Sequence, residues 1–422
     1  MVSFARPRGM KDFFPSEMKI REQVIESIRE TFRTYGYLPF DTPSVERLDV
    51  LERKGGDEIE GQIFRIEGDL GLRFDLTVPL ARVCGGNQFV LPFKRYAIGP
   101  VWRREEPQRG RMREFYQADV DIVGSTRPEC EAELLSCAND CIEKLGFQKP
   151  RIRINSRKVL DSLCKKFMIE DKKKSCLLRI LDKKNKVSDD QIKKEMIDCG
   201  ISQTQVENIL SFIGAKMKNE EALEAVRQVV NGKEVADEIE RVLALCKDYG
   251  ISPAIDLSLV RGLAYYTGMV FEMELGREIG SVAGGGRYDN LVGLFGRNLP
   301  AVGISLGVER LCTLLEEKKG RDESVTYAKV YVAAVREEFS SYARKVAVKL
   351  RRNGIPCETD TMGRNLARQI EYAKKLGIPF VIIVGEKETK EDKVTLRELE
   401  SGMERMLKVD DVGDAIEEKN NS

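Results

Sequence analysis

A segment rich in arginine, carboxylate and aromatic side chains, WRREEPQRGRMREFYQADVD at 102–121, offers the most chemistry in this sequence. Guanidinium groups fit phosphates and carboxylates, and an aromatic ring beside them can stack on a nucleobase. Alternate residues of a strand share a face. The shared face would carry Arg111, Arg113, Phe115, Gln117, Asp119 and Asp121. Taken alone, the segment fits a nucleotide site and a salt-bridged surface hairpin equally well.

A second segment, LVRGLAYYTGMVFEMEL at 259–275, places Arg261 and two tyrosines in a pattern that predicts a strand. A single arginine among apolar residues is costly unless it meets an anion. A bound anion and an ion pair within the chain both remain open here.

Three glycines precede Arg287 and Tyr288 in AGGGRYDN at 283–290. Glycine lets the backbone approach another group closely. No Lys-Ser/Thr pair follows, so the segment is not a P-loop. Taken alone, a plain glycine turn is the favoured interpretation.

Two further segments place charged groups at element ends. In VGISLGVERL at 302–311 an apolar strand leads into a helix that opens with Glu309 and Arg310. A guanidinium at the N-terminus of a helix suits a phosphate. In LRFDLTVPLAR at 72–82, Asp75 and Thr77 follow a strand. A buried aspartate needs a partner, and a bound ammonium group would be one.

The chain has 422 residues and no histidine. Ser-His-Asp triads, histidine-bearing zinc sites and imidazole acid–base catalysis are therefore excluded. With 70 Lys+Arg against 69 Asp+Glu, a polyanion partner must be held by local basic patches. Ten cysteines are too few for a disulfide scaffold, and Cys137 and Cys141 are expected as thiols of a helix. Lacking a membrane span or an apolar signal core, the protein is expected in the cytoplasm.

The pattern of the core predicts helices over 17–36 and 128–145 and a long hairpin that flanks the polar loop PQRGRM. Residues 159–233 are lysine-rich, have helical periodicity and lack strand signals, which indicates a helical insertion. Its lysines fit a solvated face or an RNA contact.

A charged stretch, EKKGRDESV, precedes a tail in which strands alternate with helices, the pattern of a parallel or mixed α/β sheet. We therefore expect a core over 1–325, the helical insertion within it, and an α/β domain over 326–422.

Together these segments resemble one family, the histidyl-tRNA synthetases of the class II aminoacyl-tRNA synthetases. RPRGMKDFFP resembles the opening signature of the family, and YGYLPFDTPSVE, with Pro43, resembles motif 1, a dimer-interface element. Residues 102–121 resemble motif 2 and VGISLGVERL resembles motif 3. LVRGLAYYTG and GGGRYDNL are similar to two segments specific to the histidine enzymes, and the resemblance spans nearly the whole chain.

The resemblance implies a role for each matching residue. Arg103 would bind the α-phosphate of ATP, Arg310 the γ-phosphate, and Phe115 would stack on adenine, with Arg111 and Arg113 on the triphosphate or RNA side. Arg261 would be catalytic, together with Arg103. The histidine pocket would consist of Asp75, Thr77, Gln117, Asp121, Arg261, Tyr265, Tyr266 and Tyr288.

Two departures from the family pattern stand out. Ala264 occupies a place where the family usually has an acidic residue. Asp75 and Asp121 occupy places where some relatives have glutamate, and the shorter carboxylate would need a backbone shift or a water to reach the same atom.

The resemblance implies an α+β fold: a class II antiparallel sheet core flanked by helices, a helical insertion, and a C-terminal α/β anticodon-binding domain. It implies a homodimeric histidine–tRNA ligase with ATP and L-histidine as substrates, Mg²⁺ as cofactor and tRNA(His) as partner. A non-catalytic, histidine-binding regulatory paralogue and another class II synthetase are the alternatives. Arg103, Arg261, Arg310 and the tail favour the enzyme over the paralogue, and the two histidine-specific segments argue against another synthetase.

Overall fold

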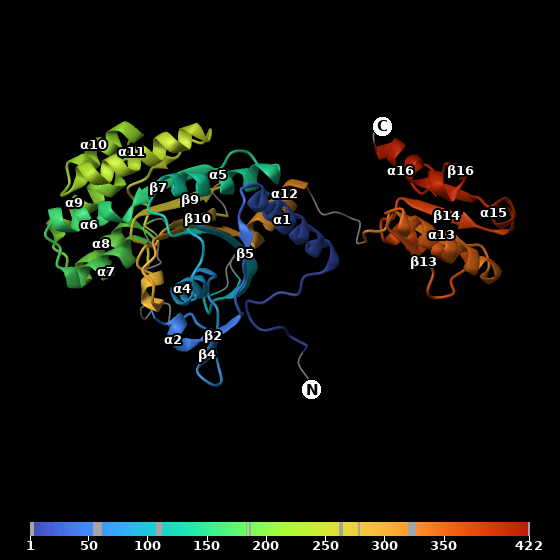
Figure 1. The fold of residues 1–422 in the computed structure, drawn as a ribbon, viewed down its shortest axis with the longest axis horizontal. Coiled ribbons are helices and arrows are strands. Elements are labelled where there is room, and N and C mark those ends of the chain that lie inside the picture. The colour runs from blue at the N-terminus through green and yellow to red at the C-terminus, as the bar shows by residue number, and fades with distance from the viewer. Residues whose placement is uncertain are drawn as a thin grey trace. The chain divides into compact units, whose positions relative to one another are not determined.

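The computed structural model describes residues 4–53, 61–106, 112–182, 184, 187–260, 265–276, 279–319 and 326–420 (Figure 1). Backbone contacts divide the chain into two compact units. The first consists of Met1–Asp12 and Arg21–Leu315, and the second of Phe13–Ile20 and Glu316–Ser422. None of the described helices is both long and apolar enough to cross a membrane.

An eight-stranded sheet with the order β1-β5-β6-β11-β10-β9-β7-β8 is the framework of the first unit. Its strands are β1 (Leu38–Pro39), β5 (Phe93–Trp102), β6 (Glu114–Val123), β7 (Arg151–Ser156), β8 (Ala254–Ile255), β9 (Met269–Glu274), β10 (Ser281–Arg287) and β11 (Ala301–Gly307). Neighbouring strands are antiparallel except for the pairs β1–β5 and β7–β8. The predicted long hairpin is confirmed, because β5 and β6 pair from Phe93 with Val123 to Trp102 with Glu114.

The glycine segment is part of a central strand, and the prediction of a turn was wrong. Strand β10 runs through Gly284, Gly285 and Gly286 between β11 and β9. A Cβ atom on Gly285 would lie 2.0 Å from the carbonyl oxygen of Gly303, and one on Gly286 would lie 2.6 Å from that of Met269. Glycine marks a close approach within a sheet as well as a turn, and here it permits the close approach.

The strand predicted over 259–275 is confirmed only in its last part, where β9 lies. Strand β8 ends at Ile255 and β9 begins at Met269, so Tyr265 and Tyr266 lie before β9 and not on it. Their ring centroids are 5.0 Å apart and both rings are buried in one cluster. Adjacent side chains of a strand would point to opposite faces, so packing both rings on one side requires a non-strand backbone.

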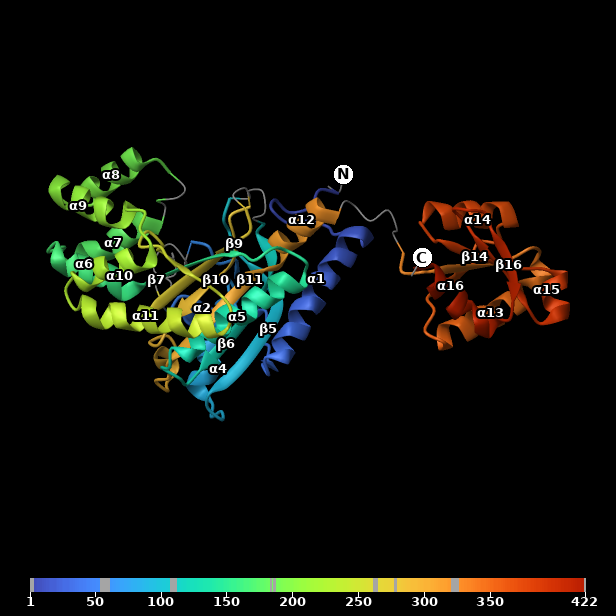
Figure 2. The same ribbon diagram turned by 90° about the horizontal axis from the view of Figure 1, so that it is seen from above.

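Helices cover the sheet (Figure 2). Helices α1 (Pro15–Thr34) and α5 (Glu129–Lys144) occur where the periodicity predicts them. Helix α5 lies along the sheet, and a buried ion pair joins its Glu131 to Arg287 at the end of β10. Helix α12 (Val308–Lys319) follows β11 directly. Helix α4 (Thr77–Gly86) and α2 (Leu48–Leu51) accompany a small sheet of β2 (Val45–Arg47), β4 (Leu70–Leu72) and β3 (Arg65–Ile66).

The lysine-rich region is helical, as predicted, and contains no strand in its described part. Its helices are α6 (Arg157–Lys166), α7 (Asp171–Asp182), α8 (Asp189–Asp198), α9 (Gln203–Gly214), α10 (Asn219–Arg227) and α11 (Gly232–Asp248). The hydroxyls of Ser188 and Ser202 cap α8 and α9 by accepting backbone N–H bonds. A disulfide joins Cys176 to Cys199, whereas Cys137 and Cys141 of α5 are buried free thiols.

The second unit contains a mixed five-stranded sheet, as the alternating pattern predicts. Its strands, in sheet order, are β13 (Cys357–Thr359), β12 (Val330–Ala334), β14 (Phe380–Val384), β15 (Val394–Glu398) and β16 (Glu404–Leu407). Its helices are α13 (Ser340–Arg352), α14 (Leu366–Lys375), α15 (Glu386–Glu391) and α16 (Val412–Asn420). The pairs β13–β12 and β12–β14 are parallel, whereas β14–β15 and β15–β16 are antiparallel.

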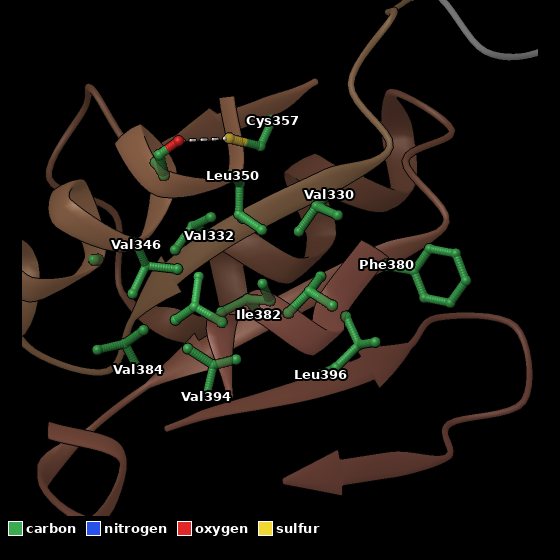
Figure 3. Packing of buried hydrophobic residues seen from close by; sticks show 14 of the residues in the cluster. Val330, Val332, Val346, Leu350, Cys357, Phe380, Ile382, Val384, Val394 and Leu396 are labelled. Atoms are coloured by element: carbon green, nitrogen blue, oxygen red, sulfur yellow. Dashed lines mark hydrogen bonds between the residues drawn. The ribbon is translucent and has the colours of Figure 1, made fainter. Parts of the chain in front are cut away.

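Both faces of this second sheet are buried. On one face Val332 and Ile382 pack against Val346 and Leu350 of α13, with Val384 and Leu396 beside them (Figure 3). On the other face Tyr331 and Val381 belong to a cluster with Ala373 of α14. Alternate residues of β12 and β14 therefore face opposite helices, which explains the continuous apolar runs of these two strands.

Candidate active site

The central strands bring a row of polar side chains to one face of the large sheet. Gln117, Asp119 and Asp121 alternate along β6 and are all buried. Their neighbours on β11 are small: Gly307, Ser305 and Gly303, respectively. Because these neighbours are small, no bulky side chain of β11 separates the three polar groups, which form a buried polar cluster on one face of the sheet.

Asp121 contacts one side chain through each of its carboxylate oxygens. Its Oδ1 accepts a hydrogen bond of 2.5 Å from the phenol of Tyr288, which follows β10. Its Oδ2 lies 2.7 Å from Nη2 of Arg95, the facing residue on β5. Oδ2 is not aligned for a hydrogen bond with Arg95 or with any other described residue. Burial raises the pKa of Asp121, and Arg95 and the Tyr288 bond oppose that rise.

Asp119 lies beside Asp121 on the same face. Nε2 of Gln117 donates to Asp119 Oδ1 at 3.3 Å and to Ser305 Oγ at 2.6 Å. Burial, and then the charge of Asp121, raise the pKa of Asp119 to about 7. This second carboxylate is therefore poised to change its charge near neutral pH.

Arg103 connects the row to the end of the hairpin. Its Nη2 donates to Oε1 of Gln117 at 3.2 Å and its Nε to the carbonyl oxygen of Phe74 at 2.9 Å. Its guanidinium lies 5.2 Å from the ring centroid of Phe115. One arginine thus contacts the polar row and the aromatic ring at once.

The turn before α4 forms a second wall. Oδ1 of Asp75 accepts the backbone N–H groups of Thr77 at 3.1 Å and Val78 at 2.9 Å, so this buried carboxylate holds the first turn of α4. The phenol of Tyr265 donates to Asp75 Oδ2 at 3.4 Å. Burial raises the pKa of Asp75, and the amide bonds and Arg103 oppose the rise. A bound cation would stabilise the ionised form.

Three tyrosines and two glycines lie around the polar cluster. The rings of Tyr265 and Tyr288 are 5.9 Å apart, and all three tyrosine rings belong to one buried cluster. A Cβ atom on Gly286 would lie 2.7 Å from the ring of Tyr266, and one on Gly303 would lie 1.9 Å from Asp121 Oδ1. The floor must therefore be glycine for the tyrosine and the carboxylate to lie over it.

The remaining predicted residues lie on neighbouring elements. Arg113 donates to the carbonyl oxygen of Glu105 at 3.0 Å near the loop end of the hairpin. Arg310 lies in the first turn of α12 and donates to the carbonyl oxygen of Ser281, at the opposite end of β10 from Tyr288. Arg111, Arg261 and Ala264 lie outside the described residues.

Sequence reasoning did not assign Arg95 or Asp119 to the site. The signal for Asp119 was present, because alternation placed it on the same face as Gln117 and Asp121. Arg95 stands in the apolar strand pattern FKRYAIG. Like Arg261, it is an arginine among apolar residues, which is costly unless it meets an anion.

The described residues include no group of three Cys, Asp or Glu side chains arranged to hold a metal ion. The three aspartates of the pocket are instead held by Arg95, Tyr288, Gln117 and backbone amides. Carboxylates held in this way suit an organic cation with several N–H donors better than a bare metal ion.

Two family descriptions match this chain. Residues 9–311 match the histidyl-tRNA synthetase family, and residues 329–419 match an anticodon binding domain. The first match spans the large sheet, both walls of the pocket and the lysine-rich helices.

The chain is also similar to named relatives over nearly its full length. It is 39% identical to the histidine–tRNA ligase of Korarchaeum cryptofilum, with 99% of each chain covered. It is 37% identical to that of Clostridium tetani, covering 96% of this chain and 95% of the relative. The crystal structure of histidyl-tRNA synthetase from Nostoc sp. PCC 7120 superposes with a TM-score of 0.85 at 31% identity, over 99% of this chain and 100% of that one.

Proposed function

The chain belongs to the histidyl-tRNA synthetase family, and we propose that it is an ATP-dependent histidine–tRNA ligase whose amino-acid pocket is the buried cluster on β6. The observation that carries this proposal is the environment of Asp121: a buried carboxylate bonded to a phenol, with one oxygen not aligned to any described donor. A neutral imidazole offers one N–H donor and one bare nitrogen. A carboxylate and a tyrosine hydroxyl match that pair.

The α-amino group of histidine would bind at the other wall. Asp75 and Thr77 present a carboxylate and a hydroxyl at the start of α4, and Gln117 presents an amide oxygen from β6. An ammonium group there would neutralise a carboxylate whose burial otherwise favours its protonated form. We propose that Asp121, Tyr266 and Tyr288 contact the ring, with Tyr265 supporting Asp75.

Activation joins two anions, so the chain must neutralise charge and align the reactants. A carboxylate oxygen of histidine attacks the α-phosphorus of ATP, and the bond from that phosphorus to the departing pyrophosphate breaks. The 3′-terminal ribose hydroxyl of tRNA(His) then attacks the carbonyl carbon, and AMP leaves. We propose that Arg103 binds the α-phosphate beside the amino acid; its contacts with Gln117 and with the ring of Phe115 support this role.

The other nucleotide contacts are proposals from the matching motifs. Phe115 would stack on adenine, and Arg310 would bind the γ-phosphate. Arg111 and Arg113 would lie on the triphosphate side, and Arg261 would act on the α-phosphate and carboxylate. We propose that Mg²⁺ accompanies ATP as its counter-ion; because the described residues lack a carboxylate group arranged for a metal, no step is assigned to it.

Further proposals concern organisation. We propose a catalytic core over 1–325, a helical insertion over 159–233 and an anticodon-binding domain over 326–422 that contacts tRNA(His). We also propose that the enzyme is a cytoplasmic homodimer, which light scattering during size-exclusion chromatography would test by its mass.

Pyrophosphate exchange tests the activity directly. Purified protein with ATP and each amino acid in turn is expected to exchange labelled pyrophosphate with histidine alone. The Asp121→Asn variant, which keeps the volume of the side chain, is expected to require more histidine. Exchange with a different amino acid would identify another class II synthetase, and no exchange with any amino acid would identify a non-catalytic paralogue.

A further inference from the structure

Arg95 has no role in the proposed reaction, although it is one of the most deeply buried charges of the described chain, with 1% of its surface exposed. It projects from β5 on the same face as the polar row. Its Nη2 lies 2.7 Å from Oδ2 of Asp121 and donates to the carbonyl oxygen of Leu76 at 3.0 Å. One nitrogen atom therefore contacts both walls of the pocket.

The contact of Arg95 with Leu76 reaches the turn that is proposed to bind the α-amino group. Leu76 stands between Asp75 and Thr77, the two residues proposed to hold the α-amino group, and its carbonyl group lies within that turn. Asp121 is the residue proposed to bind the imidazole ring of histidine. The two groups belong to segments about 45 residues apart in sequence, and contacts between the segments fix their relative position. Arg103 supplies one such link, from Phe74 to Gln117, and Arg95 supplies the link that reaches Asp121 itself.

The charge of Arg95 is also needed. Asp119 and Asp121 are both buried on this face, and Arg95 attracts both of them. Removing a buried guanidinium would leave uncompensated carboxylates, and a buried ion pair adds little to stability by itself. A role in placing the carboxylate accounts for the charge better than a role in stability does.

We infer that Arg95 is a positioning residue that sets the distance and orientation between the ring-binding carboxylate and the turn for the amino group. This inference rests on the proposed function. Arg95 contacts no reacting atom. It favours histidine because the ring and the α-amino group must both fit their binding groups at the distance that Arg95 sets.

The test compares two ligands that differ in one group. Histidine has both ring and α-amino group, whereas imidazolepropionate lacks only the amino group. The ratio of the inhibition constant of imidazolepropionate to the KM for histidine, both from pyrophosphate exchange, therefore measures amino-group recognition. Asp121→Asn is expected to weaken both ligands and leave the ratio unchanged.

Arg95→Met is expected to raise the KM for histidine by about 100-fold, because one partner of a buried pair is lost. It is also expected to lower the ratio by about 10-fold, since the turn loses a hydrogen bond. The KM for ATP should change by less than about threefold. Arg153→Met is the matched control: Arg153 is also buried among carboxylates, at the far side of the sheet, and its loss should leave the ratio unchanged.

An unchanged KM for histidine in Arg95→Met would overturn the inference. An unchanged ratio would also overturn it, because Arg95 would then act on Asp121 alone. Should Arg95→Met not fold, Arg95→Met/Asp121→Asn removes both members of the ion pair and is compared with Asp121→Asn by the same ratio. Absence of histidine-dependent exchange in the unmodified protein would instead refute the proposed function, so the two failures are distinguishable.

Discussion

The phenol of Tyr288 donates a 2.5 Å hydrogen bond to Oδ1 of Asp121, and both side chains are buried. The bond joins the end of β10 to β6 across the intervening strand β11. Burial, and then the charge of Asp121, hold the pKa of Tyr288 well above its ordinary value, so the phenol keeps its proton and donates. A histidine ring bound at Asp121, as proposed, would therefore either contact Oδ2 or displace this phenol.

Tyr288→Phe is expected to weaken histidine binding while the fold is retained. The change leaves a buried acceptor without its donor, which costs about 1–3 kcal/mol, and should raise the KM for histidine by about 10-fold. Thermal unfolding and pyrophosphate exchange would measure the two effects. Tyr331→Phe is a matched control, because that buried phenol bonds to Asp360 in the second unit, and its loss should leave the KM unaltered. Equal KM values for the two variants would contradict the role of Tyr288.

Asp75→Asn separates the structural role of Asp75 from its charge. An asparagine oxygen can still accept the N–H groups of Thr77 and Val78, so α4 should keep its first turn. The ammonium group would lose its counter-charge, and the KM for histidine should rise by about 10–100-fold. Imidazolepropionate, which has no amino group, should bind as before. Equal weakening of both ligands would show that Asp75 does not meet the amino group.

Much of the fold and part of the site follow from local sequence. The hairpin, the helices predicted over 17–36 and 128–145 and the α/β tail each follow from the spacing of apolar residues. The alternation along β6 placed Gln117, Asp119 and Asp121 on one face, where the structure has them. These features depend only on side chains a few residues apart.

The rest depends on contacts between distant segments. The bond between Tyr288 and Asp121 joins residues whose proximity is set by strand order in the sheet. The contact of Arg95 with Leu76 joins β5 to the turn before α4. Contacts between distant segments also decide that the three glycines lie in strand β10. They likewise decide that Tyr265, which lies before β9, packs its ring into the buried cluster. Strand order is not encoded in local periodicity, and so these relationships could not be read from the sequence.

Asp119 is expected to make stability depend on pH. Its pKa is raised to about 7 by burial, from an ordinary value of 3.8. Between about pH 4 and about pH 7 the unfolded chain releases this proton while the folded chain keeps it. The free energy of unfolding contributed by Asp119 is therefore fully present below about pH 4 and is lost as the pH rises through about 7. The chain has no histidine, so no imidazole titrates in this range.

Denaturant unfolding of the unmodified protein and Asp119→Asn at several pH values would reveal this contribution. The stability of the unmodified protein relative to the variant should fall by up to a few kcal/mol as the pH rises across the window. Glu309→Gln should give a difference of the same sign, since burial also raises the pKa of Glu309 to about 7. A difference curve for Asp119→Asn that does not slope would refute the assignment.

Gly303→Ala tests whether the pocket requires its glycine floor. The added methyl group would lie 1.9 Å from Oδ1 of Asp121, so the carboxylate must move away from Tyr288. Overpacking of this kind costs about 1–3 kcal/mol, and histidine-dependent exchange should fall by at least about 10-fold, as the ring loses its acceptor. Gly86→Ala is the control, because a Cβ atom there would meet nothing within 4 Å. Normal histidine affinity in Gly303→Ala, with Gly86→Ala also normal, would place the ring elsewhere than beside Asp121.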